Sequence, residues 1–217
     1  MVRALDGVTI DVLRGEFLCV AGSSGSGKTT LLNLLAGLDT GTSGTVHLEG
    51  SPLGTMTRRQ LASYRARKVG MIFQSFNLIP HYTALQNVEM ALYFNDTPPR
   101  ERRRSALAML ERLGLADRMT HRPADLSGGE QQRVAIARAI VKNPEILFAD
   151  EPMGNLDFEN AGQIANLLTG LNRDGLTIVM VTHNLEMAQQ RANRTIRMQY
   201  GRVVSPATVP LAGGPRL

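Results

Sequence analysis

Gly22-Ser23-Ser24-Gly25-Ser26-Gly27-Lys28-Thr29 is the stretch that decides the fold of this 217-residue chain. It fits the pattern G-x-x-x-x-G-K-[ST] of a phosphate-binding loop, or P-loop. The glycines allow consecutive backbone N–H groups to turn inward and form a concave anion site. The lysine of such a loop reaches the β- and γ-phosphates of a nucleotide, and the hydroxyl that follows it ligates Mg²⁺. The stretch therefore predicts a nucleotide site in which Lys28 and Thr29 have these two roles.

The segments on either side of the loop support this interpretation. Residues 16–21 are mostly apolar and predict a short buried strand, whereas residues 28–35 predict a helix whose N-terminus faces the phosphates. A flexible Gly/Ser-rich loop could match the pattern by chance, but it would not be expected to lie between a strand and a helix. The context therefore favours a P-loop over a flexible linker.

The composition is ordinary for a globular protein, with 43% hydrophobic and 20% charged residues. The net charge of +5 is typical of nucleotide-binding and membrane-apposed proteins, but also of many others. Cys19 is the single cysteine, so we expect neither a disulfide framework nor a Cys-based zinc site. No apolar run approaches the ~20 residues that a membrane-spanning helix needs, and residues 1–6 lack the apolar block of a signal peptide. We expect a chain that works where ATP is available, inside the cell.

The order of the remaining segments predicts an α/β fold. Further strands are predicted over residues 8–13, 45–48, 69–73, 146–149, 176–181, 195–198 and 202–204. Helices are predicted over residues 57–68, 83–94, 100–113, 128–143 and 159–172. The alternation indicates a P-loop NTPase core, a mostly parallel sheet flanked by helices, with an antiparallel N-terminal β portion.

The run of helices in the middle of the chain interrupts this alternation, and we interpret it as an inserted α-helical subdomain. The expected organisation is a single domain over residues 1–204. Its core covers about 1–74 and 144–204, and the inserted subdomain covers about 75–143. A flexible tail is expected over 205–217, where proline and glycine are frequent.

Four polar residues follow predicted strands. Asp150 and Glu151 follow the strand at 146–149, and Gln74 and His183 each come just after another strand. Ligands gather at the carboxyl ends of parallel strands, so we expect these side chains near the P-loop. Asp150 suits a metal, and Glu151 is the candidate general base for an attacking water. Adjacent acids could instead form a helix-capping turn, and His183 could be a surface residue; behind a P-loop the catalytic interpretation is favoured.

Leu126-Ser127-Gly128-Gly129-Glu130-Gln131-Gln132-Arg133 indicates the family. With this stretch the chain resembles the ATP-binding subunits of ABC transporters, which carry this LSGGE/Q-Q-x-R signature. The resemblance extends from about Leu5 to Val204 with all major motifs in order, whereas the P-loop alone would indicate only an NTPase. In the family, the signature of one subunit closes over ATP held by the P-loop of another. The resemblance therefore implies that a second copy of the chain is a partner.

The resemblance also implies a role for each motif residue. Gln74 becomes the Q-loop glutamine, Glu151 polarises water, His183 is the switch histidine and Asp157 crosses the dimer interface. The implied nucleotide-binding residues are Gly22, Ser23, Ser24, Gly25, Ser26, Gly27, Lys28, Thr29 and Thr30. The implied signature residues, acting in trans, are Leu126, Ser127, Gly128, Gly129 and Glu130. The implied cofactors are ATP and Mg²⁺, and the implied metal ligands are Thr29, Gln74 and Asp150.

Less specific sequence patterns indicate a branch of the family. Residues 73–80, 83–88 and 154–157 look like the lipoprotein-release and macrolide-export branch. That likeness implies ATP hydrolysis that drives a transmembrane permease subunit to export or extract a hydrophobic or lipid-linked substrate. The chain would then lie peripherally on the cytoplasmic face of the inner membrane. A regulatory ATPase of cell-division type, which signals without transport, and a polar amino-acid importer ATPase remain alternatives with the same motifs.

Two further features bear on partners. DNA-repair and chromosome-maintenance ATPases share these motifs, but they need coiled-coil or zinc-bearing insertions for which this chain is too short. The basic cluster at 100–104 is interpreted as the solvated face of a helix, so no nucleic acid partner is expected.

Met153 stands where the family usually has a small hydroxylated residue. It could perturb the dimer interface or simply pack, as a flexible side chain can.

Overall fold

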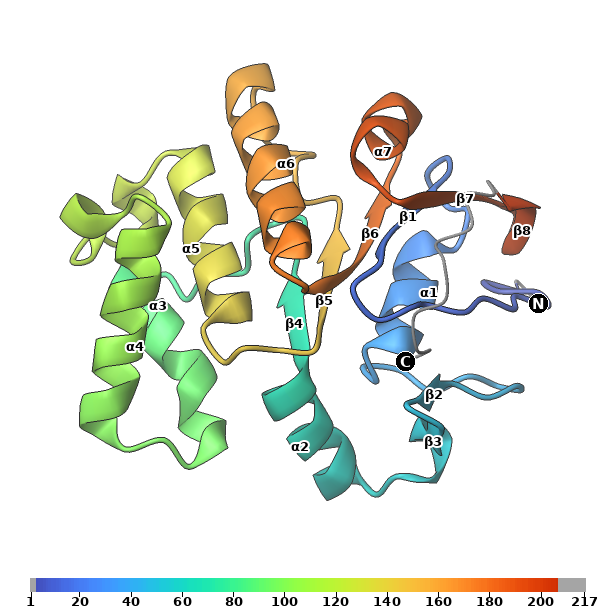
Figure 1. Cartoon of the computed structure of the whole chain (residues 1–217), viewed down its shortest axis with the longest axis horizontal. Helices are drawn as coiled ribbons and strands as arrows, with labels where there is room; N and C mark the ends of the chain where they lie inside the picture. The colour runs from blue at the N-terminus through green and yellow to red at the C-terminus, as the bar shows by residue number, and fades with distance from the viewer. Residues whose placement is uncertain (1–2, 207–217) are drawn as a thin grey trace.

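The computed structural model describes residues 3–206. A six-stranded sheet of order β4-β5-β6-β1-β7-β8 forms its centre (Figure 1). All neighbouring strands are parallel except the last pair, in which β8 runs antiparallel to β7. The strands of this sheet are β1 (Phe17–Ala21), β4 (Val69–Ile72), β5 (Ile146–Asp150), β6 (Thr177–Thr182), β7 (Arg194–Gln199) and β8 (Arg202–Pro206). A separate antiparallel pair consists of β2 (His47–Leu48) and β3 (Ser51–Pro52).

Helices cover both faces of the sheet. They are α1 (Lys28–Leu35), α2 (Arg58–Lys68), α3 (Ala84–Glu89), α4 (Pro99–Arg112), α5 (Gly128–Ile140), α6 (Phe158–Arg173) and α7 (Leu185–Arg191). Short 3₁₀ turns cover Leu53–Thr55, Met90–Asn95, Ala116–Arg118 and Pro123–Asp125. Side chains alternate along each strand, so Phe17 and Cys19 face one hydrophobic cluster with α5 and α6, while Leu18 and Val20 face another with α1. The two clusters together form the core, and burial raises the pKa of Cys19 to about 12.

The α/β fold expected from the sequence is confirmed, with a mostly parallel sheet, flanking helices and a separate antiparallel pair. The helices α3, α4 and α5 follow one another and lie together at one end of the sheet (Figure 1). Ser205 and Pro206, which were expected in the flexible tail, belong to β8. The rest of that expected tail, residues 207–217, lies outside the described residues.

The strand predicted over residues 8–13 is wrong. Only Leu13 makes an isolated bridge, and the rest of the segment is irregular. Val8 and Ile10 are partly buried against the second cluster, whereas Thr9 and Asp11 are exposed. The alternation therefore reflects one-sided burial without a partner strand. The strand predicted over 45–48 is likewise reduced to β2, and α7 was not predicted.

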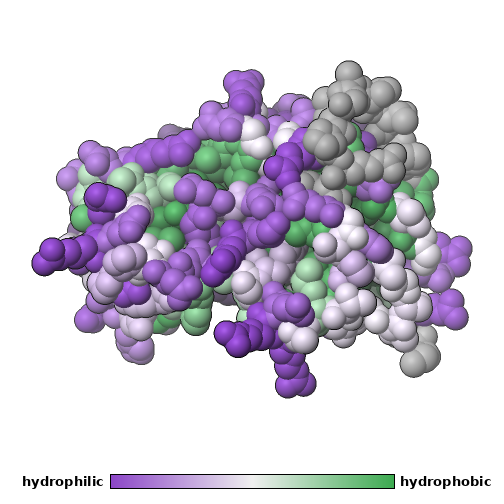
Figure 2. All heavy atoms as spheres, turned by 60° about the horizontal axis from the view of Figure 1, so that its bottom comes forward, coloured by the Kyte–Doolittle hydropathy of each residue, from purple (hydrophilic) through white to green (hydrophobic). Residues whose placement is uncertain are grey.

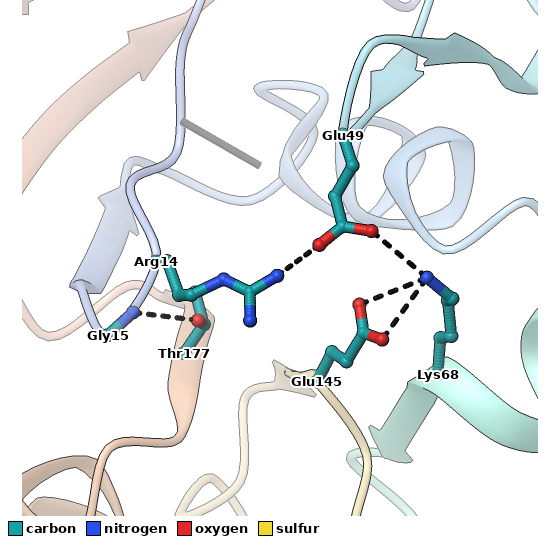
Figure 3. Close-up of polar contacts among 6 residues, drawn as sticks. All are labelled: Arg14, Gly15, Glu49, Lys68, Glu145 and Thr177. Atoms are coloured by element: carbon teal, nitrogen blue, oxygen red, sulfur yellow. Dashed lines mark hydrogen bonds and ion pairs between the residues drawn. The ribbon is translucent and has the colours of Figure 1, made fainter. Parts of the chain in front are cut away.

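Charged side chains tie together the edge of the sheet at which β4, β5 and β6 begin (Figure 3). Lys68 Nζ lies 3.1 Å from Glu49 Oε2 and 3.1 Å from Glu145 Oε1, and these contacts raise its pKa. Glu49 also forms an ion pair with Arg14. Gly15, which follows Arg14, donates its backbone N–H to Thr177 Oγ1 at 2.9 Å. Half-exposed ion pairs contribute little stability each. Their effect is to close this edge, so the opposite edge, where the parallel strands end, remains for ligands.

Candidate active site

The P-loop joins the end of β1 to the start of α1. Gly22 N donates to Thr182 O at 3.3 Å, and a Cβ on Gly22 would lie 2.4 Å from Met198 O, so the loop lies close to the ends of β6 and β7. Gly27 has φ 97°, and a Cβ there would lie 2.4 Å from Ala4 O. No side chain caps α1. Its first N–H groups are therefore available to an anion.

Lys28 lies under this loop. Its side chain is buried, with 7% of the residue exposed, and its Nζ donates to Gly22 O at 2.8 Å and to Ser23 O at 3.0 Å. The Ser26 hydroxyl oxygen is also buried, without a hydrogen-bond partner among the described residues. The concave loop thus holds an ammonium group and an unpaired hydroxyl. These groups fit a polyphosphate.

Thr29 and Asp150 meet across the loop. Thr29 Oγ1 donates to Asp150 Oδ1 at 3.2 Å. The pKa of Asp150 is raised, chiefly because burial disfavours its charged form, although the hydrogen bond from Thr29 opposes this. No group of three or more His, Cys, Asp or Glu side chains suited to a metal exists among residues 3–206. An oxygen pair of this kind fits Mg²⁺, which commonly takes one or two protein oxygens and completes its shell with water and substrate phosphates.

Glu151 and His183 form the second pair. His183 Nδ1 lies 3.0 Å from Glu151 Oε2. The backbone of Glu151 has φ 44°, a left-handed conformation that is strained for a residue with a side chain. It is held there because Glu151 N donates to Val181 O at 3.0 Å and Glu151 O accepts from Gly154 N at 2.9 Å. The carboxylate is therefore oriented by an imidazole at the end of the neighbouring strand.

Gln74 follows β4 and belongs to the same edge. Its backbone oxygen accepts a hydrogen bond from Asn155 Nδ2 at 2.9 Å. A Cβ on Gly154 would lie 3.6 Å from Gln74 Nε2, so the side chain reaches the loop that follows Glu151. The structure thus brings the P-loop, Asp150, Glu151, His183 and Gln74 to one edge, as the sequence predicted. No sequence pattern predicted Asn155 as the residue that links the two loops.

The signature stretch does not join this cluster. Ser127 caps α5 in a reciprocal arrangement, in which Glu130 N donates to Ser127 Oγ at 3.2 Å and Ser127 N donates to Glu130 Oε2 at 2.8 Å. These bonds, with one from Arg118, lower the pKa of Glu130. A Cβ on Gly129 would lie 2.0 Å from Asn160 Oδ1, so any other residue here would require the Asn160 side chain to move. Figure 1 places α5, the helix that Ser127 caps, and α1, the helix that follows the P-loop, on opposite sides of β5 and β6.

The loop between β5 and α6 carries two other predicted residues. Asp157 caps α6, accepting from Asn160 N at 2.8 Å and from Asn160 Nδ2 at 2.7 Å, and these bonds lower its pKa. Asp157 is exposed and Phe158 is 96% exposed, so this loop is open to a partner. Met153 is buried in the first hydrophobic cluster. Of the two outcomes considered for Met153, the structure shows packing.

The basic cluster lies on α4. Arg103 is exposed, with Nη1 3.8 Å from Glu89 Oε1, and Arg102 lies over the ring of Tyr93 at 4.2 Å from its centroid. Arg100 and Arg104 are exposed. This arrangement agrees with a solvated helix face.

Comparison with known proteins gives consistent matches. A family model described as ABC transporter matches residues 5–154. The ABC transporter ATP-binding protein YbbA of Escherichia coli K12, itself described as uncharacterized, is 51% identical over 204 residues, which cover 94% of this chain and 89% of YbbA. The macrolide export ATP-binding/permease protein MacB of Brucella melitensis is 45% identical over 95% of this chain, which corresponds to 32% of MacB.

A solved structure has the same fold. It is a dimeric, post-hydrolysis state of the ATP-binding cassette MJ0796 bound to ADP and Pi. The two chains superimpose with a TM-score of 0.87 and 40% sequence identity, covering 96% of this chain and 93% of that one. At this identity the likeness extends beyond the fold to the family.

Proposed function

Because this chain belongs to the ABC transporter family and is an ATP hydrolase of that type, we propose that two copies of it hydrolyse ATP together and drive a membrane permease. The observation that carries the proposal is the group of side chains at the carboxyl ends of the parallel strands. It combines an uncapped helix N-terminus with a buried lysine, an Asp–Thr oxygen pair and a Glu–His pair. These are the parts that phosphoryl transfer from ATP to water requires.

The residues divide the reaction between them. Lys28 and the N–H groups at the start of α1 bind the β- and γ-phosphates, and Ser26 adds a hydroxyl. Thr29 and Asp150 would hold Mg²⁺, together with Gln74. When bound, the ion neutralises charge that develops on the phosphate oxygens. Glu151 accepts a proton from the attacking water, and His183 keeps its carboxylate in place. The new bond joins the water oxygen to the γ-phosphorus, and the bond to the β-phosphate oxygen breaks, which yields ADP and phosphate.

The second copy completes the site. Ser127 caps α5, and α5 lies on the other side of β5 and β6 from α1, which follows the P-loop of the same chain (Figure 1). A two-fold axis would place each signature over the other chain's ATP and bury two nucleotides. Asp157, exposed at the start of α6, would cross between the two copies. The dimeric MJ0796 structure supports this assembly.

An apolar groove with a volume of about 240 Å³ supports the proposal that the chain binds a membrane partner. It lies between α2, β4, the 3₁₀ turn after α3 and α5; Met71, Phe73 and Phe94 are among its lining residues. Figure 2, in which the bottom of Figure 1 comes forward, shows hydrophobic side chains set among hydrophilic ones on the surface. Lys142 lines the same groove, and burial lowers its pKa to about 8. An apolar segment that brings an acidic side chain would fill the groove and stabilise the charged form of Lys142.

We assign the groove to a cytoplasmic helix of the permease. In MacB, a protein whose name includes both ATP-binding and permease functions, the matching region is only about a third of the chain. The similarity to MacB supports the proposal that ATP hydrolysis drives export of a hydrophobic or lipid-linked substrate. The chain would then lie on the cytoplasmic face of the inner membrane and be held there by the permease.

Replacing Lys28 with alanine tests the phosphate site. We expect ATP affinity measured by calorimetry to fall about tenfold or more, because the substitution removes a charge-assisted contact to the phosphates. Arg58→Ala, at the exposed start of α2, serves as the control and should leave affinity unchanged. Equal affinity of the Lys28→Ala protein and the wild type would contradict the role given to Lys28.

Replacing Phe94 with aspartate tests the groove. Phe94 is 76% exposed, so the substitution should not disturb folding, but it places a charge where an apolar helix would dock. We expect the tagged chain to lose at least about 90% of its co-purification with the membrane protein encoded beside its gene, since hot-spot aromatics carry most of the energy of an interface. Val204→Asp, at another exposed apolar site, is the control. Retained co-purification of the Phe94→Asp protein would exclude the groove as the docking site.

A further inference from the structure

Arg138 makes an unusual pair of contacts near the end of α5. Its Nη1 donates to Asn77 O at 2.5 Å and its Nη2 donates to Phe76 O at 2.8 Å. One guanidinium therefore binds two successive backbone carbonyls of the turn that follows Gln74. Two parallel donors of this kind fix both the position and the orientation of what they bind.

The turn needs such support because it is strained. Phe76 and Asn77 have φ 60° and 49°, two consecutive residues in the left-handed region. Asparagine tolerates that conformation, but phenylalanine does so only at a cost. The turn is closed by Phe76 N donating to Phe73 O at 3.2 Å and by Asn77 N donating to Ser75 O at 2.6 Å. Such a conformation persists only where its surroundings hold it.

Arg138 is half-buried, so its charged form is partly desolvated. Burial lowers its pKa, and no carboxylate lies within ion-pair distance of it in the described part of the chain. An apolar side chain could fill the same space without this cost. The guanidinium is therefore explained by the two carbonyls that it binds.

The helix that carries Arg138 also reaches the other parts of the site. Ser127 begins α5, and Gln132, one turn further along, donates to Pro152 O at 2.6 Å in the loop directly after Glu151. Arg138 itself lines the apolar groove. One continuous helix thus joins the signature, the loop after Glu151, the turn after Gln74 and the groove.

We propose that Arg138 is a positioning residue that holds the turn at residues 73–77, so that Gln74 reaches the metal and the γ-phosphate only while α5 is in place. Filling of the groove by the permease and engagement of Ser127 by a second copy would both reach Gln74 through this contact. The inference rests on the proposed function and adds a route by which the membrane partner regulates hydrolysis.

The first test compares three variants of the purified chain. Arg138→Met, which keeps the bulk but removes the donors, should lower kcat about tenfold, because displacement of a catalytic group by about 1 Å is sufficient for such a loss. The KM for ATP should stay within about twofold, since Lys28 and the P-loop are untouched. Arg138→Lys should recover part of the loss. Arg102→Met, which removes a half-buried arginine of α4 that donates to Thr97 O, is the matched control and should keep full activity.

A double variant separates positioning from general stability. If Arg138 acts through Gln74, then Gln74→Ala and Arg138→Met should each lower kcat, and the double variant should be no slower than the slower single one. Multiplying losses, or an Arg138→Met protein with kcat within twofold of the wild type, would overturn the inference. A silent Gln74→Ala would also overturn it, whereas a wild-type chain without ATPase activity would refute the proposed function itself.

A second measurement does not depend on activity. The chain has no tryptophan, so Phe76→Trp introduces a single fluorescent reporter into the turn. Adding Arg138→Met should increase acrylamide quenching of this tryptophan at least about twofold, because a released turn exposes its side chain to solvent. The Arg102→Met control should leave quenching unchanged. Equal quenching with and without Arg138 would show that the turn holds its shape unaided, which contradicts the inference.

Discussion

Replacing Glu151 with glutamine is expected to lower ATP turnover of the purified chain by about 10²-fold or more, while ATP still binds. The substitution keeps the shape of the side chain and its contact with His183 Nδ1, but an amide cannot accept a proton from water. Lys28, Thr29 and Asp150, which we propose bind the nucleotide and the metal, are unchanged. The measurement is steady-state phosphate release together with calorimetric binding of ATP.

Glu111→Gln supplies the control for this change. Glu111 is an exposed residue of α4, and its replacement removes the same charge without touching the site. Turnover of this variant should match the wild type. Near-normal hydrolysis by the Glu151→Gln protein would remove Glu151 from the role of general base.

The second large effect concerns assembly. The Glu151→Gln protein should form a dimer in ATP and remain monomeric in ADP, because in the proposed dimer only the γ-phosphate would contact the partner's Ser127 and favour closure. Adding Ser127→Arg should abolish the dimer almost completely. The arginine would clash at the partner's nucleotide, yet ATP binding to the monomer should stay nearly intact. Light scattering with ATP present measures the assembly.

Ser43→Arg in the Glu151→Gln background is the matched control, since Ser43 is an exposed loop residue outside the signature. Its dimer should persist. An ATP-dependent dimer that survives Ser127→Arg would mean that the signature does not act in trans.

Much of the fold was predictable because its signals are local. The apolar runs of β1, β5 and β6 are buried on both faces and mark the strands directly. The helix α7 gave no comparable signal, since it has seven residues, of which only Ala188 is buried. The segment at 8–13 gave a false signal, because alternating burial resembles a strand whether or not a partner strand is present.

The residues of the site likewise divide into those that a local sequence motif predicts and those that it does not. The P-loop and the acidic pair at 150–151 follow from residues that are adjacent in sequence, so motif and context were sufficient. Asn155, Gln132 and Arg138 act on loops that are remote in the chain, and their contacts exist only after folding. Arg138 in particular reads in the sequence as one more polar residue of a helix.

The central place of β1 bears on how the chain is made. Phe17 pairs with Ile178 on one side, and Leu18 pairs with Arg194 on the other. During synthesis the first strand of the sheet therefore cannot pair until residues 178 and 194 have left the ribosome. Pairings this remote in sequence form slowly, and an unpaired apolar strand is prone to aggregation. The P-loop follows this strand directly, so it reaches its folded position only after β6 and β7 have been synthesised.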